Sequence, residues 1–252
     1  MNTVTLKKIL VPFDFSEDFT NSFRVARNIA KVSGASITII NVVSQIAEAG
    51  SDFVNSCILP LTKSELYIKQ RRSEIELYLK NKVDRKITIR IEIGDFNSKI
   101  IELCRKEKFD LIVVPDFHKT PMDRLFSDIN PLLIMERTKI AVISVNNYVG
   151  EYKIKNIMLP IRNVVNWFKK VRYVVEIANL TGAKVFVLGV ANSSSKQVQK
   201  NIFDKMTICE NILKENEIRF EVDTMFGHGE PYHDVLMESK YKRVDLIAVS
   251  SP

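Results

Sequence analysis

Short apolar runs alternate along the chain with stretches in which apolar residues recur at helical spacing. The run at 36–43 is rich in β-branched residues and predicts a strand, whereas Phe23, Ala26 and Ile29 share one face of a predicted helix. Up to residue 145 the pattern predicts strands at 8–13, 36–43, 87–93, 111–114 and 140–145, and helices at 17–32, 63–81, 98–108 and 129–136. This alternation predicts a parallel sheet covered on both faces.

The same pattern occurs twice, which predicts two tandem α/β domains. An offset of 148 residues relates Pro12 to Pro160 and Gly34 to Gly182, and an offset of 135 residues relates Gly94 to Gly229 and Asp110 to Asp245. Two offsets that hold over separate blocks indicate an internal repeat whose second copy has a shorter middle segment.

The second copy predicts strands at 154–161, 184–190, 219–224 and 246–249, after a short polar connection at 148–155. We expect one complete domain at 1–146 and a second at 152–252 that lacks the last helix and the fifth strand. Either the chain is truncated, or something else completes the second sheet.

Composition favours a protein of the cytoplasm. No apolar run is long enough to cross a bilayer, and the first eight residues lack the apolar stretch of a signal peptide. The net charge of +7 is densest at 69–72, 105–108 and 240–243, within helix-like stretches that also carry acids or apolar residues. Solvated helix faces explain these clusters better than a nucleic-acid partner does. The cysteines Cys57, Cys104 and Cys209 are far apart and are expected to be free thiols.

Four segments together resemble the universal stress protein family. They are Ile-Leu-Val-Pro-Phe-Asp-Phe-Ser at 9–16, Gly-Ala-Ser-Ile-Thr-Ile-Ile-Asn-Val-Val at 34–43, Gly-Asp-Phe at 94–96 and Phe-Asp-Leu-Ile-Val-Val at 109–114. The resemblance implies a Rossmann-like, doubly wound sheet of order 3-2-1-4-5 in each domain. It also implies a role in the stress response and, in some members, bound ATP.

The resemblance allows the nucleotide pocket to be checked residue by residue. In relatives that bind ATP, a glycine motif after the fourth strand brings backbone amides close to the phosphates. The four motif positions here are Pro115, His118, Asp128 and Ile129, and none matches. Proline lacks an amide donor, side chains obstruct close approach, and Asp128 would repel phosphate oxygens. We therefore expect a degenerate pocket and no ATP cofactor.

The adenine end of the pocket is better preserved. Asp14 occupies the position whose carboxylate contacts the base in ATP-binding relatives, and Val42 lies near the adenine-contacting backbone. Asp14 has a second interpretation, because it stands where it could cap the helix that starts near Ser16. In the second copy Arg162 takes the place of this aspartate.

Other candidate sites are weaker. His228 and His233, with Asp234 nearby, could suggest a metal site, but a five-residue spacing suits shared ligation on a helix poorly. We interpret both as turn or surface histidines and expect no metal. Trp167 begins a predicted helix. We interpret its side chain first as a packing residue and second as a contact with a partner.

The favoured function is a non-enzymatic stress-response protein that acts as a binding or interaction module. The alternative is an adenine-nucleotide sensor or weak ATPase that uses the pocket around Asp14. A hydrolase or transferase was also considered, but no nucleophile, base and oxyanion donors can be assembled. In resembling proteins the fifth strands of two domains meet, so we expect a homodimer through strand 140–145. The sequence does not identify the protein partners or the stress signal.

Overall fold

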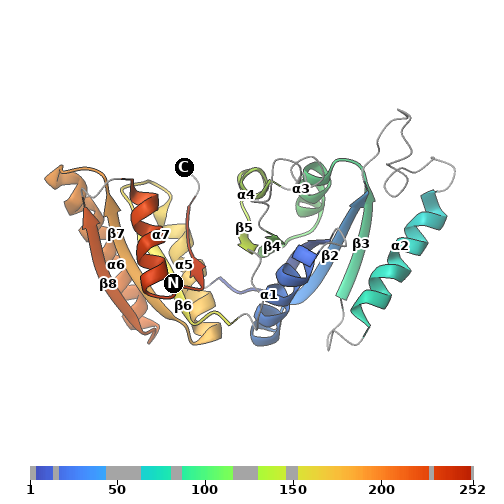
Figure 1. Ribbon diagram of the computed structural model, residues 1–252, viewed down its shortest axis with the longest axis horizontal. Coiled ribbons are helices and arrows are strands. Elements are labelled where there is room, and N and C mark those ends of the chain that lie inside the picture. The colour runs from blue at the N-terminus through green and yellow to red at the C-terminus, as the bar shows by residue number, and fades with distance from the viewer. Residues whose placement is uncertain are drawn as a thin grey trace. The chain divides into compact units, whose positions relative to one another are not determined.

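The computed structural model describes residues 4–13, 17–43, 64–80, 87–115, 130–145, 153–226 and 230–250. The chain divides into two compact units, residues 6–150 and residues 151–252, with Val4 and Thr5 assigned to the latter. We call them the first unit and the second unit. Each contains its own parallel sheet (Figure 1).

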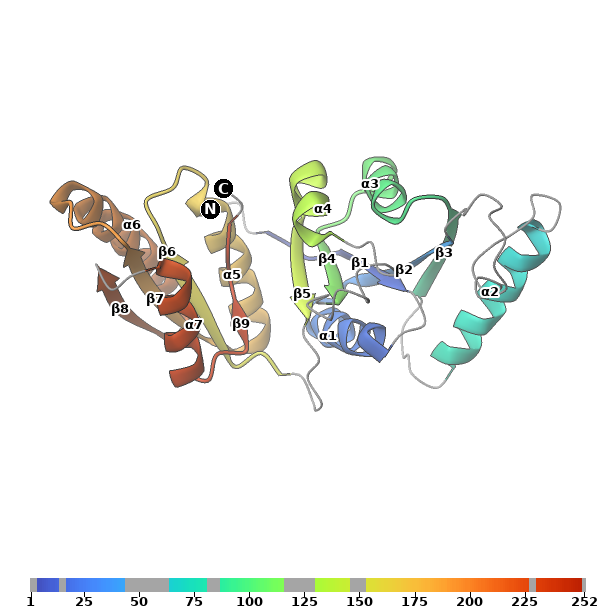
Figure 2. The ribbon, with the colours of Figure 1, turned by 45° about the horizontal axis from the view of Figure 1, so that its top comes forward.

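The first unit has a five-stranded sheet of order β3-β2-β1-β4-β5. Its strands are β1 (Lys8–Phe13), β2 (Ser36–Val43), β3 (Ile87–Ile93), β4 (Leu111–Pro115) and β5 (Ala141–Val145). Its helices are α1 (Glu17–Ser33), α2 (Ser64–Leu79), α3 (Phe96–Lys106) and α4 (Pro131–Thr138). Figure 2 shows α3 and α4 on one side of the sheet and α1 on the other. The predicted doubly wound fold and strand order are confirmed.

The second unit has a four-stranded parallel sheet of order β8-β7-β6-β9 among its described residues. Its strands are β6 (Asn156–Ile161), β7 (Lys184–Ala191), β8 (Phe220–Phe226) and β9 (Leu246–Ile247). Its helices are α5 (Trp167–Thr181), α6 (Lys196–Glu215) and α7 (Pro231–Tyr241). In both ribbon views α7 lies in front of this sheet, with α5 and α6 behind it (Figures 1 and 2). In both units the first helix, α1 or α5, therefore lies on one face of the sheet, and the helix after the third strand, α3 or α7, lies on the other (Figures 1 and 2).

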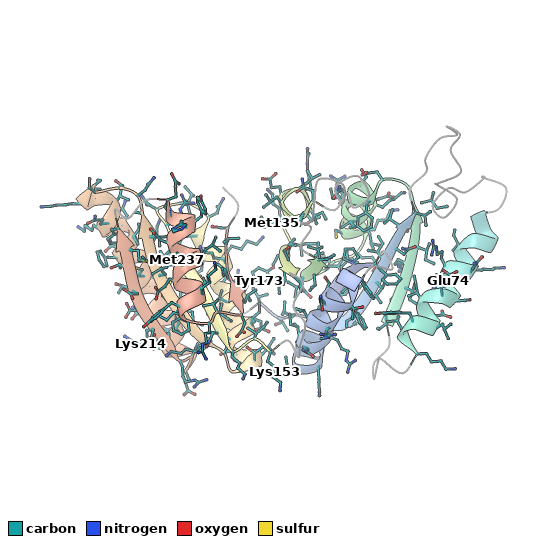
Figure 3. All side chains as sticks on the ribbon, in the orientation of Figure 1. Glu74, Met135, Lys153, Tyr173, Lys214 and Met237 are labelled. Carbon is teal, nitrogen blue, oxygen red and sulfur yellow. The ribbon has the colours of Figure 1, made fainter. Side chains whose placement is uncertain are left out.

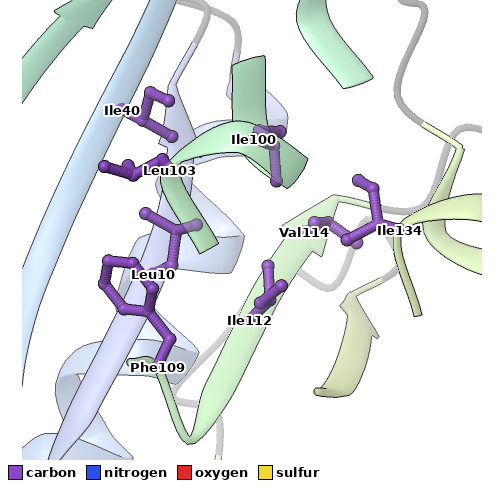
Figure 4. Packing of buried hydrophobic residues seen from close by; sticks show 8 residues of the cluster. All are labelled: Leu10, Ile40, Ile100, Leu103, Phe109, Ile112, Val114 and Ile134. Atoms are coloured by element: carbon purple, nitrogen blue, oxygen red, sulfur yellow. The ribbon is translucent and has the colours of Figure 1, made fainter. Parts of the chain in front are cut away.

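Burial follows the place of each strand in its sheet. β1 and β4 are central, and nearly every residue is buried because helices cover both faces. β3 lies at an edge and keeps exposed positions at Thr88 and Arg90. On the α3 and α4 side, eight apolar side chains form one cluster (Figure 4): Leu10, Ile40, Ile100, Leu103, Phe109, Ile112, Val114 and Ile134. Burying each such side chain contributes roughly 1.5–3 kcal/mol.

Two helix starts differ from the sequence prediction because a side chain sets them. α3 begins at Phe96 instead of residue 98, since the Asp95 carboxylate accepts a hydrogen bond from the amide of Ser98 at 2.8 Å. α4 begins at Pro131 instead of residue 129, since Asn130 caps it and proline suits the first helical position.

An aspartate joins the two central strands in each unit. The Asp110 Oδ2 accepts hydrogen bonds from the amides of Lys7 and Lys8 at 2.8 and 2.9 Å, and its own amide donates to the Lys8 carbonyl. In the second unit Asp245 Oδ2 accepts from Lys155 and Asn156 at the same two distances. These contacts fix the amino end of β4 or β9 beside the first strand.

Beyond this aspartate the two central strands pair only briefly. β1 pairs with β4 through Ile9 and Leu10, although β4 runs on to Pro115. Because both main-chain groups of Lys8 face β4, strand geometry directs those of Pro12 to the same side. Proline has no N–H to donate, so the ladder stops there. Pro160 holds the same position in β6, which pairs with β9 through two residues.

We expect Asp245→Ala to lower the free energy of unfolding of the second unit by about 1–2 kcal/mol, because two amides lose a charged acceptor. Urea unfolding followed by the fluorescence of Trp167, the chain's one tryptophan, measures this loss directly. Asp245→Asn keeps an oxygen acceptor and should lose less. Asp204→Ala, an exposed site on α6, is the matched control and should change little. Equal stability of Asp245→Ala and the wild type would contradict the role of this contact.

Candidate functional site

The strand order reverses at β1 and at β6, and this defines where a site is expected. In doubly wound sheets, ligands bind beyond the carboxyl ends of the strands at such a switch point. In the first unit β1 ends at Phe13 and β4 at Pro115, just past the place where their ladder stops. The second unit repeats this arrangement at Ile161.

Two of the predicted site residues lie at this edge of the first unit. Val42 is half-buried on β2 and packs against the cluster under α3 and α4. Pro115 is the buried last residue of β4 and pairs with Val145 of β5. They flank β1 from either side, as their strands do. Asp14, His118 and Asp128 lie outside the described residues, so the structure does not test their positions.

Asn41, a polar residue at this edge, is not among the site residues that the sequence predicts. Its side chain is 5% exposed, and its Nδ2 donates to the carbonyl of Phe13 at 2.8 Å, which ties the end of β1 to β2. Its Oδ1 is buried and has no partner among the described residues. A buried acceptor without a donor is unfavourable by about 1–3 kcal/mol, so this atom needs an explanation. Asparagine within an otherwise β-branched run was the available signal.

The second unit shows that the fold itself does not need Asn41. Phe13 is opposite Asn41 in the first ladder, and Ile161 is opposite Gly189 in the second. A Cβ at Gly189 would lie 2.4 Å from Sδ of Met206, so α6 fills the space with an apolar side chain. Asn41 is therefore specific to the chemistry of the first unit.

The start of α4 stands where the resembling proteins would approach a phosphate. Pro131 at its first position has no N–H, and the Asn130 Oδ1 accepts from the amide of Leu133 at 3.0 Å. The amide of Asn130 donates to Oδ1 of Asn97 at 2.9 Å. Three of the backbone positions at this helix end are thus without a donor or already bonded, which leaves a poor phosphate cradle.

The corresponding edge of the second unit is cationic. Arg162, the counterpart of Asp14, is exposed in the loop after β6. Lys205 of α6 reaches this loop and donates to the Arg162 carbonyl at 3.4 Å, to Oδ1 of Asn163 at 3.2 Å and to the Val164 carbonyl at 3.0 Å. The Nζ of Lys205 also lies 5.9 Å from the centre of the half-buried Trp167 ring. One ammonium group thereby holds the whole loop.

A second lysine contacts the end of β6, just before this loop. The ammonium of Lys170 donates to the carbonyl of Pro160. Burial lowers the pKa of Lys170 to about 8, and the Arg162 charge acts in the same direction while Cys209 opposes it. At the equivalent position the first unit has Ser22, a fully buried hydroxyl. At this matching position the second unit therefore carries an ammonium group where the first carries a neutral hydroxyl.

Asp234 is the other buried polar group without a complete set of partners. It lies in the first turn of α7 with 5% of its surface exposed, and its Oδ2 has no partner among the described residues. The neighbouring His233 is exposed, and His228 lies outside the described residues. No group of three or more histidine, cysteine or acidic side chains within the described ranges could hold a metal ion.

The described cysteines are poor nucleophiles. Burial raises the pKa of Cys104 to about 12, and burial raises the pKa of Cys209 to about 12 despite the nearby Lys170 charge. Both are free thiols and stay protonated at neutral pH, whereas the thiolate is the reactive form. Cys57 lies outside the described residues.

No helix in the described part of the chain has both the length and the apolar character of a membrane span.

The chain was compared with known proteins. The sequence profile of the universal stress protein family matches residues 5–130. A universal stress protein from Archaeoglobus fulgidus is similar in structure over 95% of this chain and 83% of its own length, with a TM-score of 0.69 and 16% identity. A putative universal stress protein from Pseudomonas aeruginosa covers 95% of this chain and 80% of its own, with a TM-score of 0.54 and 14% identity. No curated protein matched significantly.

At these identities the structural similarities establish the fold alone, which agrees with the two parallel sheets. The profile match gives more, because it spans half of the chain and covers the ends of β1, β2 and β4 that form the switch point. The chain therefore belongs to the universal stress protein family.

Proposed function

We propose that this protein is a non-enzymatic stress-response protein that acts as a binding or interaction module, with a degenerate nucleotide pocket in its first unit. The observation that carries this proposal is the start of α4, where Pro131 removes one amide donor and Asn130 engages another. Pro115 removes a third donor at the end of β4. We expect the protein in the cytoplasm.

The energetic consequence follows from the kind of bond that is missing. Charge-assisted hydrogen bonds from amides to phosphate contribute roughly 1.5–3 kcal/mol each. The loss of the two donors at Pro115 and Pro131 alone weakens binding by about 3–6 kcal/mol, which is about 10²–10⁴-fold in affinity. An intact adenine contact at Asp14 does not offset a loss of this size.

Two features support a binding role over catalysis. The described cysteines, Cys104 half-buried and Cys209 buried, are protonated, so they offer no activated nucleophile. On α7, large apolar side chains face solvent: Met237, which Figure 3 labels, is 54% exposed, and Tyr241 is 78% exposed. Tyr232 and Leu236 on the same helix are also exposed. Apolar side chains grouped on a surface are typical of contacts with other proteins.

The second candidate function is an adenine-nucleotide sensor or weak ATPase that uses the pocket around Asp14. Asn41 favours it, because its Oδ1 has no partner among the described residues and its Nδ2 bonds the carbonyl of Phe13, the residue before Asp14 in the sequence. An exocyclic amine, such as that of adenine, would supply the missing donor. This candidate requires phosphate contacts that differ from those of the glycine motif.

The first unit also suggests how the chain assembles. β5 is the outermost strand of its sheet, so one of its edges has no neighbouring strand among the described residues. Ala141 and Val142 are only partly buried, and Ser144 is exposed. An open apolar edge favours pairing with another strand. We propose a homodimer through strand 140–145.

Calorimetric titration of Mg-ATP into the purified protein tests the degenerate pocket. We expect no saturable binding at micromolar concentrations, because the phosphates lack the amide donors described above. The protein as isolated should also carry no nucleotide, which absorbance at 260 nm and mass spectrometry detect. Micromolar or tighter binding that is lost in Asp14→Ala would reject the degenerate pocket and establish the sensor.

Light scattering over a range of protein concentrations tests the assembly. We expect the mass of a dimer for the wild type and a shift toward monomer for Ser144→Lys, because like charges on facing edge strands repel. Ser144→Thr, which favours strands and adds no charge, is the control and should remain dimeric. A monomeric mass for the wild type at high concentration would exclude this dimer.

A further inference from the structure

Three basic side chains lie at the end of β6 and in the loop that follows it in the second unit. Lys205 comes from α6, Lys170 from α5, and Arg162 from the loop itself. No ion pair joins any of the three to a carboxylate within the described residues. Like charges held close together are unfavourable unless an anion compensates them.

The repeat shows that the fold does not demand this charge. The first unit has the same order of strand and helix, β1 and α1, with Asp14 and Ser22 at the sequence positions that match Arg162 and Lys170. Its sheet has the same parallel pairing on both sides of the central strand. The cations therefore need a reason other than the architecture, and their place at the switch point is where doubly wound sheets bind ligands.

The donors that remain available indicate what kind of ligand fits. Lys205 has three acceptors on the loop, which match its three N–H groups, so it holds the loop in shape. Lys170 has one acceptor, Pro160, and so keeps donors in reserve. The exposed guanidinium of Arg162 has no partner in the described part of the chain. A guanidinium presents two parallel N–H groups, which match two oxygens of a phosphate.

We propose that the loop after β6, with Arg162 and Lys170 as donors and Lys205 as the residue that positions the loop, binds a small anion of the phosphate class. Arg162 contacts two oxygens of the anion, and Lys170 contributes the second charge. Burial and the Arg162 charge already lower the pKa of Lys170, and a bound anion relieves this repulsion. The site is independent of the nucleotide pocket of the first unit, so either proposal can fail without the other.

Trp167 provides the measurement, because the only tryptophan of the chain lies 5.9 Å from the Nζ of Lys205. The full chain is titrated with inorganic phosphate, and separately with pyrophosphate, at constant ionic strength maintained with sodium chloride. We expect a saturable change in fluorescence with a Kd on the order of 1 mM or tighter. Arg162→Asp, which copies the charge of the first unit, should weaken binding at least tenfold.

Two further variants keep the test decisive. Arg162→Lys retains the charge but loses the paired N–H groups, and should bind with intermediate affinity. Lys200→Ala removes an exposed lysine from the same helix as Lys205 and should bind like the wild type. Calorimetry repeats each titration without the fluorescence readout. A response equal to that of sodium chloride alone, or unchanged binding by Arg162→Asp in a folded protein, would overturn the proposal.

Discussion

The contact between one carboxylate and two backbone amides at the amino end of the switch point underlies the rest of each unit. Asp110 joins β4 to β1, and Asp245 joins β9 to β6, with the same pair of distances in both. The two central strands share only two paired residues in each sheet, so their ladder alone is a weak connection. Without the carboxylate, little would fix the place where the strand order reverses.

This reversal decides where chemistry can occur. The aspartate binds the strands at one end, and Pro12 or Pro160 stops their pairing toward the other. Both units therefore offer the same location, but they fill it differently. The first unit has the buried amide of Asn41, whereas the second has Arg162, Lys170 and Lys205. The same fold therefore carries different polar side chains at the switch point of each unit.

The sequence predicted the elements well where burial is continuous and less well where local contacts set a boundary. Strands 8–13, 36–43 and 87–93 have the predicted bounds, because apolar and β-branched runs need only a covering layer to become strands. α3 and α4 begin after Asp95 and Asn130, whose side chains bond an amide three residues further along the chain. The end of β9 at Ile247 instead depends on β6, a strand distant in the sequence with which its pairing ends at Met158.

The sequence by itself determined the repeat, the fold family and the loss of the glycine motif, because each is written in residue types and spacing. It marked Asp110 and Asp245 as repeated positions but could not assign their amide partners, about a hundred residues away. Only the tertiary structure brought Lys205 to the loop of Arg162 and left Oδ1 of Asn41 without a donor in the part of the chain that the structure describes. The reason is physical: spacing along the chain fixes local periodicity, while hydrogen bonds and charge neighbours arise only after distant segments pack.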